Sequence, residues 1–438
     1  MKKTKNKQVG TKMLNLDQII NDINEGRLDD KLLDIYVDES KLSTQKDRYI
    51  NALNEYKKLF TEELDGIYSA PGRSEIGGNH TDHQHGETLA ASINDDAIAM
   101  VKSTDKNVVN VLSEGYDMIT IDLNDIDKKD SEEGTTIALI KGVIKGVKDH
   151  GYNIGGFNAY ITSNVLSGSG LSSSAAFETL IGTILSGLYN DMKIPAVEIA
   201  IIGQYAENYY FGKPCGLLDQ TASSVGGLCH MDFINPKEPA VTKVNFDMES
   251  YGYSLCITDT KGSHADLTDD YAAVPKEMKE VASFFGKEVL IEVDEADVIK
   301  NAAVIREKYS DRAFLRVIHF YEENKRVNQE VEALKTGDID TFLKTVNASG
   351  NSSYKYLQNV YTNHDVEHQN VSVALMLSEL FLGNNGVARV HGGGFAGTIQ
   401  AFVKNEAVAD YKKKMDIVFG DGACNVLKIR KYGGMKVL

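Results

Sequence analysis

The stretch that decides how this chain folds is Leu166-Ser-Gly-Ser-Gly-Leu-Ser-Ser-Ser-Ala-Ala-Phe177. Two glycines and a run of hydroxyl residues come first, and this composition is typical of a loop. The apolar residues that follow fall on one face of a helix: Ala175, Ala176, Leu180, Ile181, Ile184, Leu185 and Leu188. The pattern therefore predicts a loop that opens into a buried helix.

Such a junction is suited to phosphate. Glycines let the backbone approach a ligand, and the first amides of a helix have no partner and carry partial positive charge. No Lys follows the last glycine, so the stretch is not the common P-loop. A plain turn-forming connection remains the alternative.

Composition limits the classes of function. With 438 residues, we expect two domains. A net charge of -16 argues against nucleic acid or an anionic membrane as the main partner. No stretch reaches the ~18 apolar residues of a membrane span, and polar residues after Met1 argue against a signal peptide. Four widely spaced cysteines without a Cys-x-x-Cys pair favour a reducing compartment, so we expect a cytoplasmic protein.

The expected organisation has three parts. Residues 1–60 are highly charged and read as a mostly helical extension, residues 61–245 as a first domain with the phosphate loop, and residues 246–438 as a second domain. Residues 231–248 read as the connection. Hydrophobic patterns predict strands at 89–100, 107–123, 157–161 and 253–260 and helices at 135–147, 196–210, 340–346 and 371–382.

A second cluster of polar residues lies between two apolar segments, at positions 68–86. We interpret it as a binding loop on a rigid scaffold, with a polar surface loop as the alternative. Its three histidines lack the usual paired spacing on a helix, so zinc is not expected. The residues of interest are Arg73, Glu75, Asn79, His80, Asp82, His83 and His85.

Two further segments carry candidate chemistry. Asp219 lies among small and apolar residues, where a carboxylate needs a partner or a catalytic task, although a helix-capping role is also open. Residues 386–403 read as a strand, a turn at Gly392, Gly393 and Gly394, and a second strand. The turn is either a tight hairpin or a backbone that closes over a ligand.

Taken in order, three motifs resemble those of the GHMP kinases. They are Pro71-Gly-Arg-Ser-Glu-Ile-Gly-Gly-Asn-His-Thr-Asp82, Gly168-Ser-Gly-Leu-Ser-Ser-Ser-Ala-Ala176 and Gly392-Gly-Gly-Phe-Ala-Gly397. Within that superfamily, Pro214-Cys-Gly-Leu-Leu-Asp-Gln220 and the His-Thr-Asp triplet are similar to galactokinases. The resemblance runs from about residue 70 to the C-terminus. It implies an α+β fold of two domains with the active site in the cleft between them.

The resemblance also implies transfer of the ATP γ-phosphoryl group to the anomeric hydroxyl of a hexose, with galactose the first expectation. Arg73 and Asp219 match the catalytic pair: Asp219 would orient or deprotonate the hydroxyl, and Arg73 would lower its pKa and meet phosphoryl charge. Ser174 and Glu207 match the residues that hold Mg²⁺. The phosphates of ATP would lie on Gly168, Ser169, Gly170, Leu171, Ser172, Ser173 and Ser174.

The matching sugar contacts are Asn79, His80, Asp82, Gly216 and Tyr271, and here the chain departs from the family. Asn79 replaces the Glu that usually contacts the far hydroxyl of the sugar, and His83 replaces a Tyr. Glu75 and Gly77 replace the usual Asn and Ile.

A neutral amide at position 79 tolerates a C6 carboxylate, and His83 could add positive charge at mildly acidic pH. A galacturonate-type sugar acid is therefore an alternative substrate.

A second alternative is a regulatory sensor that binds ATP and sugar without turnover. The chain keeps Ser173-Ser-Ala-Ala176 together with Arg73 and Asp219, which favours catalysis. We expect a sugar and ATP as the partners, and a monomer or homodimer.

Overall fold

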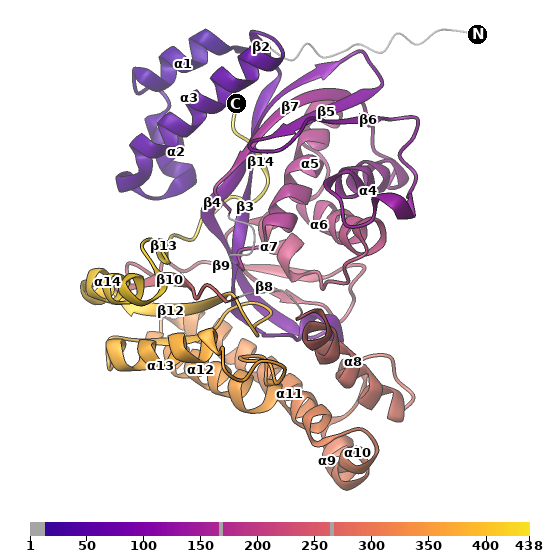
Figure 1. Ribbon diagram of the computed structural model, residues 1–438, viewed down its shortest axis with the longest axis vertical. Coiled ribbons are helices and arrows are strands. Elements are labelled where there is room, and N and C mark those ends of the chain that lie inside the picture. The colour runs from indigo at the N-terminus through magenta and orange to yellow at the C-terminus, as the bar shows by residue number, and fades with distance from the viewer. Residues whose placement is uncertain (1–13, 166–169, 263–266) are drawn as a thin grey trace.

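The computed structural model describes residues 14–165, 170–262 and 267–438. It is an elongated α+β molecule with a sheet and covering helices in each half (Figure 1). The α+β fold expected from the sequence is confirmed.

The first half is built on an eight-stranded sheet in the order β14-β3-β4-β7-β5-β6, with β8 paired to β4 and β9 to β8. All neighbours are antiparallel except the parallel pair β5 and β7. The short strand β14, from the very end of the chain, pairs with β3. The strands are β3 (Gly66–Gly77), β4 (Glu87–Thr104), β5 (Val108–Ser113), β6 (Ile119–Asp122), β7 (Gly156–Ser163), β8 (Leu228–Asp232), β9 (Ala240–Val244) and β14 (Met435–Lys436).

One face of this sheet is covered by α4 (Thr136–Asp149), α5 (Ser173–Tyr189), α6 (Ala196–Tyr205) and α7 (Leu218–Val225). The core between them consists of aliphatic residues from the sheet and from α4, α5 and α6. Helix α5 is buried along most of its length, so the predicted buried helix is confirmed. Residues 166–169 of the preceding loop lie outside the described residues.

The N-terminal helices pack on the opposite face of the same sheet (Figure 1). They are α1 (Leu16–Asn24), α2 (Asp29–Tyr36) and α3 (Leu42–Leu59), and the short strands β1 (Leu14–Asn15) and β2 (Glu63–Leu64) pair beside them. Asp96 of β4 is fully buried under these helices and accepts from Arg48 of α3 at 2.6 Å and from Arg430 at 2.9 Å. Buried charges of this kind require partners, so the network fixes the helices to the sheet.

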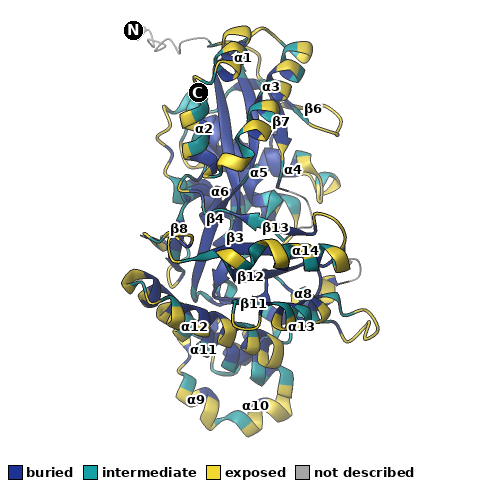
Figure 2. Cartoon of the chain, turned by 90° about the vertical axis from the view of Figure 1, so that its left-hand side faces the viewer, coloured by how far each residue is buried: buried dark blue, intermediate teal, exposed yellow. Residues whose placement is uncertain are grey.

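The second half has a four-stranded antiparallel sheet in the order β11-β12-β10-β13. Figure 2 shows the buried residues concentrated on the long strands, while exposed residues lie on the outer helices, including α9 and α10. The strands are β10 (Tyr253–Asp259), β11 (Gly386–Val390), β12 (Thr398–Lys404) and β13 (Cys424–Leu427). The helices are α8 (Thr268–Phe284), α9 (Glu295–Lys300), α10 (Ala302–Lys308), α11 (Asp311–Thr336), α12 (Ile339–Ser352), α13 (Asn370–Leu382) and α14 (Val408–Phe419).

Two sequence-based expectations are corrected. Residues 66–77, expected mainly as part of a loop, form the completely buried strand β3. The polar side chains of this strand are tolerated because they are paired inside the protein, as Arg73 is with Asp219. Residues 231–248, expected as a connection, contain β9, which extends the sheet beside β8.

Candidate active site

Arg73 and Asp219 meet in the structure although 146 positions separate them. Arg73 Nε donates to Asp219 Oδ1 at 2.6 Å. The guanidinium comes from β3 with 7% of its side chain exposed, while 35% of the Asp219 side chain, at the start of α7, is exposed. The pair is therefore anchored on one side and open to a ligand on the other.

Asp219 is held ionised. Burial alone would raise the pKa of Asp219, but the charge of Arg73 and hydrogen bonds from Arg73 and Ser172 bring the pKa below its ordinary value. A carboxylate in this state accepts hydrogen bonds at neutral pH. Its role as a helix cap is not supported, because its two oxygens bond to side chains of other elements.

The end of the phosphate loop lies beside this pair. Gly170 accepts from Arg73 Nη1, and the Leu171 carbonyl accepts from the Arg73 amide at 3.1 Å. Ser172 has a φ of 59° and stands at the N-cap of α5, but its hydroxyl donates to Asp219 and makes no cap bond. The first amides of α5 therefore have no capping side chain from the described residues. They remain available to an anion.

Ser174 and Glu207 also come together. Ser174 Oγ donates to Glu207 Oε1 at 3.0 Å, and Lys213 Nζ lies 3.1 Å from the same oxygen. Glu207 belongs to the π-helical turn Ala206–Phe211 that follows α6. The neighbouring Glu178 Oε1 is buried without a hydrogen-bond partner. Hydroxyl and carboxylate oxygens are the donors that Mg²⁺ prefers, so these residues fit the ion.

The sugar contacts expected at Asp82 and Gly216 prove to be adjacent. A Cβ at Gly216 would lie only 1.6 Å from Asp82 Oδ2. Burial and the negative charge of Asp219 together raise the pKa of Asp82 to about 6, against a hydrogen bond from the His83 amide. The Asp82 carboxylate therefore lies close enough to Asp219 for the two charges to interact.

The glycine turn after β11 closes over the first motif. His80 Nε2 donates to the Gly393 carbonyl at 3.0 Å, and Tyr271 OH donates to the Gly394 carbonyl at 2.8 Å. The Tyr271 ring packs edge-on against Phe395, with ring centroids 5.3 Å apart. The turn is thus a contact between the two halves of the molecule, and a simple hairpin does not describe it.

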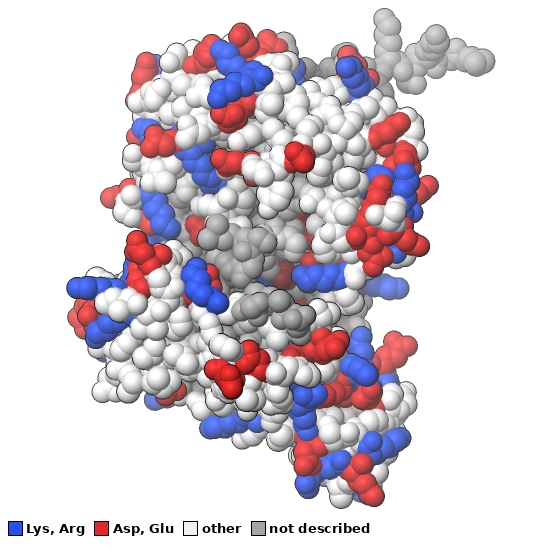
Figure 3. Space-filling view, in the orientation of Figure 1, with Lys and Arg blue, Asp and Glu red and all other residues white. Residues whose placement is uncertain are grey.

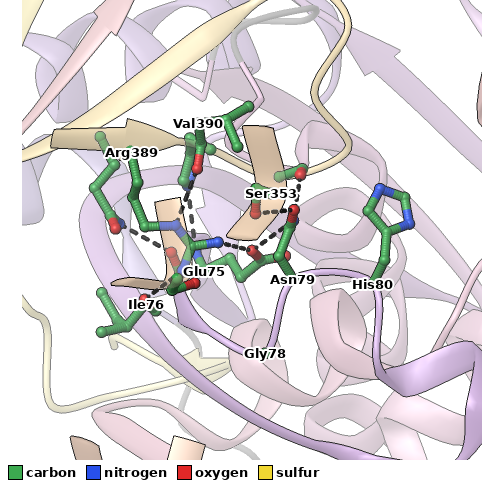
Figure 4. Close-up of polar contacts among 12 residues, drawn as sticks. Glu75, Ile76, Gly78, Asn79, His80, Ser353, Arg389 and Val390 are labelled. Carbon is green, nitrogen blue, oxygen red and sulfur yellow. Dashed lines mark hydrogen bonds and ion pairs between the residues drawn. The ribbon is translucent and has the colours of Figure 1, made fainter. Parts of the chain in front are cut away.

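Behind the site lies a network of buried charges, drawn in Figure 4. Arg389 of β11 pairs with Glu75 of β3 at 2.8 Å, and Asn79 Nδ2 donates to the same carboxylate oxygen at 2.9 Å. Glu323 of α11 accepts from the amides of Gly78 and Asn79, both at 3.3 Å. The network fixes the backbone of the first motif against the second half of the molecule.

The histidines of the motif are neutral. Burial lowers the pKa of His80 to about 4, and burial together with the neighbouring His80 lowers the pKa of His83 well below its ordinary value. The expectation that His83 gains positive charge at mildly acidic pH is therefore wrong. Among the described residues, no group of three or more His, Cys, Asp or Glu side chains is arranged to hold a metal ion.

Sequence reasoning missed Ser172 as the second partner of Asp219, and it missed Arg389 and Glu323 in the network. It also missed Asn359, whose Nδ2 donates to Asn79 Oδ1 at 2.8 Å. Arg389 was detectable, because an arginine inside the apolar strand Gly386–Val390 must pair with a buried acid. The others carry no signal of their own, since their partners lie far away in the sequence.

The face of the molecule shown in Figure 3 is mixed in charge. On the face shown, described Lys and Arg side chains alternate with Asp and Glu. No helix within the described ranges has both the length and the apolar character needed to cross a membrane. The four cysteines are all free thiols.

Two family profiles match the chain. The GHMP kinases N terminal domain matches residues 138–227, which include α5 and Asp219, and the galactokinase galactose-binding signature matches residues 54–103, which include β3 and Asp82.

Similar proteins extend the match to most of the chain. A galactokinase of Glaesserella parasuis is 31% identical over 78% of this chain and 86% of its own length, and one of Streptomyces coelicolor is 27% identical over 83% and 91%. Among solved structures, Lactococcus lactis galactokinase complexed with galactose superimposes with a TM-score of 0.75 at 24% identity, covering 87% of this chain and 98% of that one. A mevalonate kinase gives a TM-score of 0.59 at 17% identity, covering 83% and 99%.

Proposed function

The chain belongs to the galactokinase family of the GHMP kinases, and we propose that it transfers the γ-phosphoryl group of ATP to the anomeric hydroxyl of D-galactose, giving galactose 1-phosphate and ADP. The observation that carries this is the hydrogen-bonded pair of Arg73 and Asp219 beside the uncapped N-terminus of α5. Phosphoryl transfer depends mainly on positioning and on stabilising charge. The pair and the helix end supply both.

Asp219 is placed to orient the attacking hydroxyl. Because its pKa is lowered by Arg73 and Ser172, the carboxylate is ionised and accepts a hydrogen bond from the sugar C1 hydroxyl. A base of low pKa takes the proton of the C1 hydroxyl only once the bond between that oxygen and phosphorus has begun to form, because bond formation makes the proton more acidic. We therefore assign Asp219 to orientation before transfer and to proton acceptance late in it.

Arg73 has two tasks at the same place. It fixes Asp219 through Nε and the loop carbonyl of Gly170 through Nη1. Its positive charge lies where the phosphoryl group meets the sugar oxygen, and a fixed guanidinium stabilises negative charge on the transferring oxygens. The loop from Gly170 to Ser174 and the amides of α5 bind the phosphates.

Mg²⁺ is the expected cofactor, and Ser174 Oγ with Glu207 would hold it. When bound, the ion supplies positive charge to the phosphates of ATP. The ammonium group of Lys213 already forms an ion pair with Glu207. Its side chain is 62% exposed, so it can turn away into solvent.

Galactose would lie between Asp82, Gly216 and the glycine turn. Asp82 accepts hydrogen bonds from ring hydroxyls, and the absence of a side chain at Gly216 lets the backbone of residues 214–217 approach the sugar. Tyr271 packs on the sugar while its hydroxyl donates to the Gly394 carbonyl. The free cysteines support a reducing compartment such as the cytoplasm. The division at residue 245 and the monomeric or dimeric state stay predictions.

A coupled assay of ATP consumption tests the function. Galactose, glucose, N-acetylgalactosamine, arabinose and galacturonate are compared, with Mg²⁺ present and with the ion removed by a chelator. We expect Mg²⁺-dependent turnover that is fastest with galactose. ATP binding without turnover of any sugar would contradict the proposal and favour a sensor.

A further inference from the structure

Asn79 has no hydrogen-bonding capacity left for a sugar. Its side chain is fully buried. Its nitrogen donates to Glu75 Oε1 and to the Gly392 carbonyl at 2.7 Å, and its oxygen accepts from Ser353 Oγ at 3.1 Å and from Asn359 Nδ2 at 2.8 Å (Figure 4). A primary amide has two donors and two acceptor sites, so all four are used. This geometry does not favour the expected contact between Asn79 and the sugar.

Glu75, in contrast, has one carboxylate oxygen to spare. Oε1 accepts from Asn79 and from Arg389. No described residue donates a hydrogen bond to Oε2. This oxygen is also not one of the fully enclosed polar atoms, because the Glu75 side chain is 8% exposed. Arg73 and Glu75 are two residues apart in β3 and pair without a break with Ser92 and Ala90, so their side chains leave the same face of the strand.

The arginine that contacts Glu75 directly is already committed to partners inside the protein. Arg389 is completely buried, and each of its three nitrogens donates: to the carbonyls of Val390 and Ile76 and to Glu75. His80 and His83 are neutral. Arg73, the other arginine near Glu75, is paired with Asp219, so a uronic acid would meet the acid groups Glu75, Asp82 and Asp219 against this one cation.

Building on the sugar kinase activity proposed above, we propose that Glu75 determines the substrate class at this site. Its free oxygen accepts a hydrogen bond from the C6 hydroxyl of a neutral hexose and repels the C6 carboxylate of a hexuronate. The side chains of Glu75 and Asn79 are hydrogen-bonded to each other, so this pair contains one carboxylate and one amide. Asn79 is the positioning residue that orients this acid.

Glu75→Gln tests this assignment by removing the charge at constant size. kcat/KM is measured for galactose, 6-deoxygalactose and galacturonate. The wild type should prefer galactose over galacturonate by about 100-fold or more, since like charges in contact cost several kcal/mol. At pH 8, about one unit above the pKa of Glu75, this ratio should fall by about tenfold in Glu75→Gln, through the KM values of the two sugars, because one repulsive charge is gone. The KM for ATP should not change.

Glu277→Gln is the matched control. It makes the same substitution at another largely buried carboxylate, because the Glu277 side chain is 14% exposed and pairs with Arg312 and Arg316. The described hydrogen bonds and ion pairs of Glu75 and Asn79 involve none of these three residues. Glu277→Gln should lower stability while leaving the ratio between galactose and galacturonate within about twofold of the wild type, since no charge facing the sugar is altered.

The pH dependence of the wild type gives a second readout. Burial raises the pKa of Glu75 to about 7, against the charges of Arg389 and Arg73 and the hydrogen bond from Asn79. The groups that face Glu75 are Arg389 and His391 from the second half, Arg73 and Asp82 from the first motif, and Glu330 from α11. The preference for galactose over galacturonate should therefore decrease as pH falls from 8 to 6, and Glu75→Gln should show a smaller change.

The outcomes separate this inference from the proposed function. Turnover of galactose with an unchanged sugar ratio in Glu75→Gln would overturn the role of Glu75 and leave the kinase activity intact. No turnover of any sugar by the wild type would overturn the function itself. If Glu75→Gln does not fold, a wild-type sugar ratio that stays constant between pH 6 and 8 would overturn the inference.

Discussion

Asp82 Oδ2 occupies the space that a side chain at residue 216 would need, 1.6 Å from the position of a Cβ. Gly216→Ala must therefore displace the Asp82 carboxylate or the backbone before α7. We expect the KM for galactose to rise by about tenfold or more, since a misplaced acceptor loses about the energy of a hydrogen bond to a charged group. kcat/KM for galactose and the KM for ATP are measured together.

Gly286→Ala is the control for this substitution, because a Cβ at Gly286 meets nothing within 4 Å. Its φ of 71° makes some loss of stability expected there, but the galactose KM should stay at the wild-type value. A normal galactose KM in Gly216→Ala would contradict the placement of Asp82 in the sugar site.

Ser172→Ala removes the second hydrogen bond to Asp219. The carboxylate then keeps only Arg73, so its pKa should rise and its orientation should loosen. A hydrogen bond to a charged group contributes about 1.5–3 kcal/mol, which corresponds to a loss of about 10- to 100-fold in kcat. Steady-state kinetics at saturating ATP and galactose measure it.

Ser378→Ala provides the comparison, because it deletes a buried hydroxyl of α13 that bonds to Ala374 and Tyr411. It should change stability without changing kcat. Wild-type kcat in Ser172→Ala would show that the serine has no part in positioning Asp219.

Protonation of Asp82 should lower the rate of the reaction at acidic pH. Its pKa of about 6 lies above the value of an unfolded Asp, so the group is protonated below pH 6 and ionised above it. Only the ionised form accepts hydrogen bonds through both oxygens. We expect kcat/KM for galactose to fall roughly tenfold per pH unit below about 6 and to level off above that value.

The profile is measured in the wild type and in Glu75→Gln, which removes the nearby group that titrates at about 7. The limb near 6 should persist in both proteins. A profile that is flat from pH 5 to 8 in Glu75→Gln would contradict the assignment of Asp82.

Asp96→Asn should weaken the attachment of the N-terminal helices. It leaves Arg48 and Arg430 without their buried counter-ion, and breaking a buried pair costs about 3–5 kcal/mol of the free energy of unfolding. Although burial alone would raise the pKa of Asp96, Arg48 and Arg430 lower it, so this stabilisation is present above the unfolded pKa and is lost as pH falls through the folded one.

Urea unfolding measures the loss, with Asp17→Ala as the control. Asp17 pairs with Lys57 on the surface of the same helices, and 62% of its side chain is exposed, so its removal should change stability little. Equal effects of the two substitutions would show that the Asp96 network does not hold the helices to the sheet.

The sequence predicted the fold class and most of the helices because these depend on local periodicity and on motifs. Helix α5 is an example, since its apolar residues recur at helical spacing, and strand β10 is another, since its apolar residues form a short continuous run. Strand β3 could not be predicted as a strand in this way. Its Arg73 and Glu75 look like surface residues until their distant partners Asp219 and Arg389 are known.

The contacts between residues of the site could likewise be predicted only in part. Ser174 with Glu207, and Arg73 with Asp219, were expected from the resemblance, and the structure brings each pair together. The saturation of Asn79 could not be foreseen, because Asn359 lies 280 positions away. Nor could the lowered pKa of His83, which results from burial in the folded chain.

The most direct test of the central claim is the position of the new phosphate. The purified protein is incubated with ATP, Mg²⁺ and galactose, and the product is examined by phosphorus and carbon NMR, in parallel with Asp219→Asn. We expect a phosphate whose phosphorus couples to the anomeric proton and carbon of galactose, formed by the wild type and strongly reduced in Asp219→Asn. A phosphate on another hydroxyl, or equal rates in the two proteins, would contradict the account.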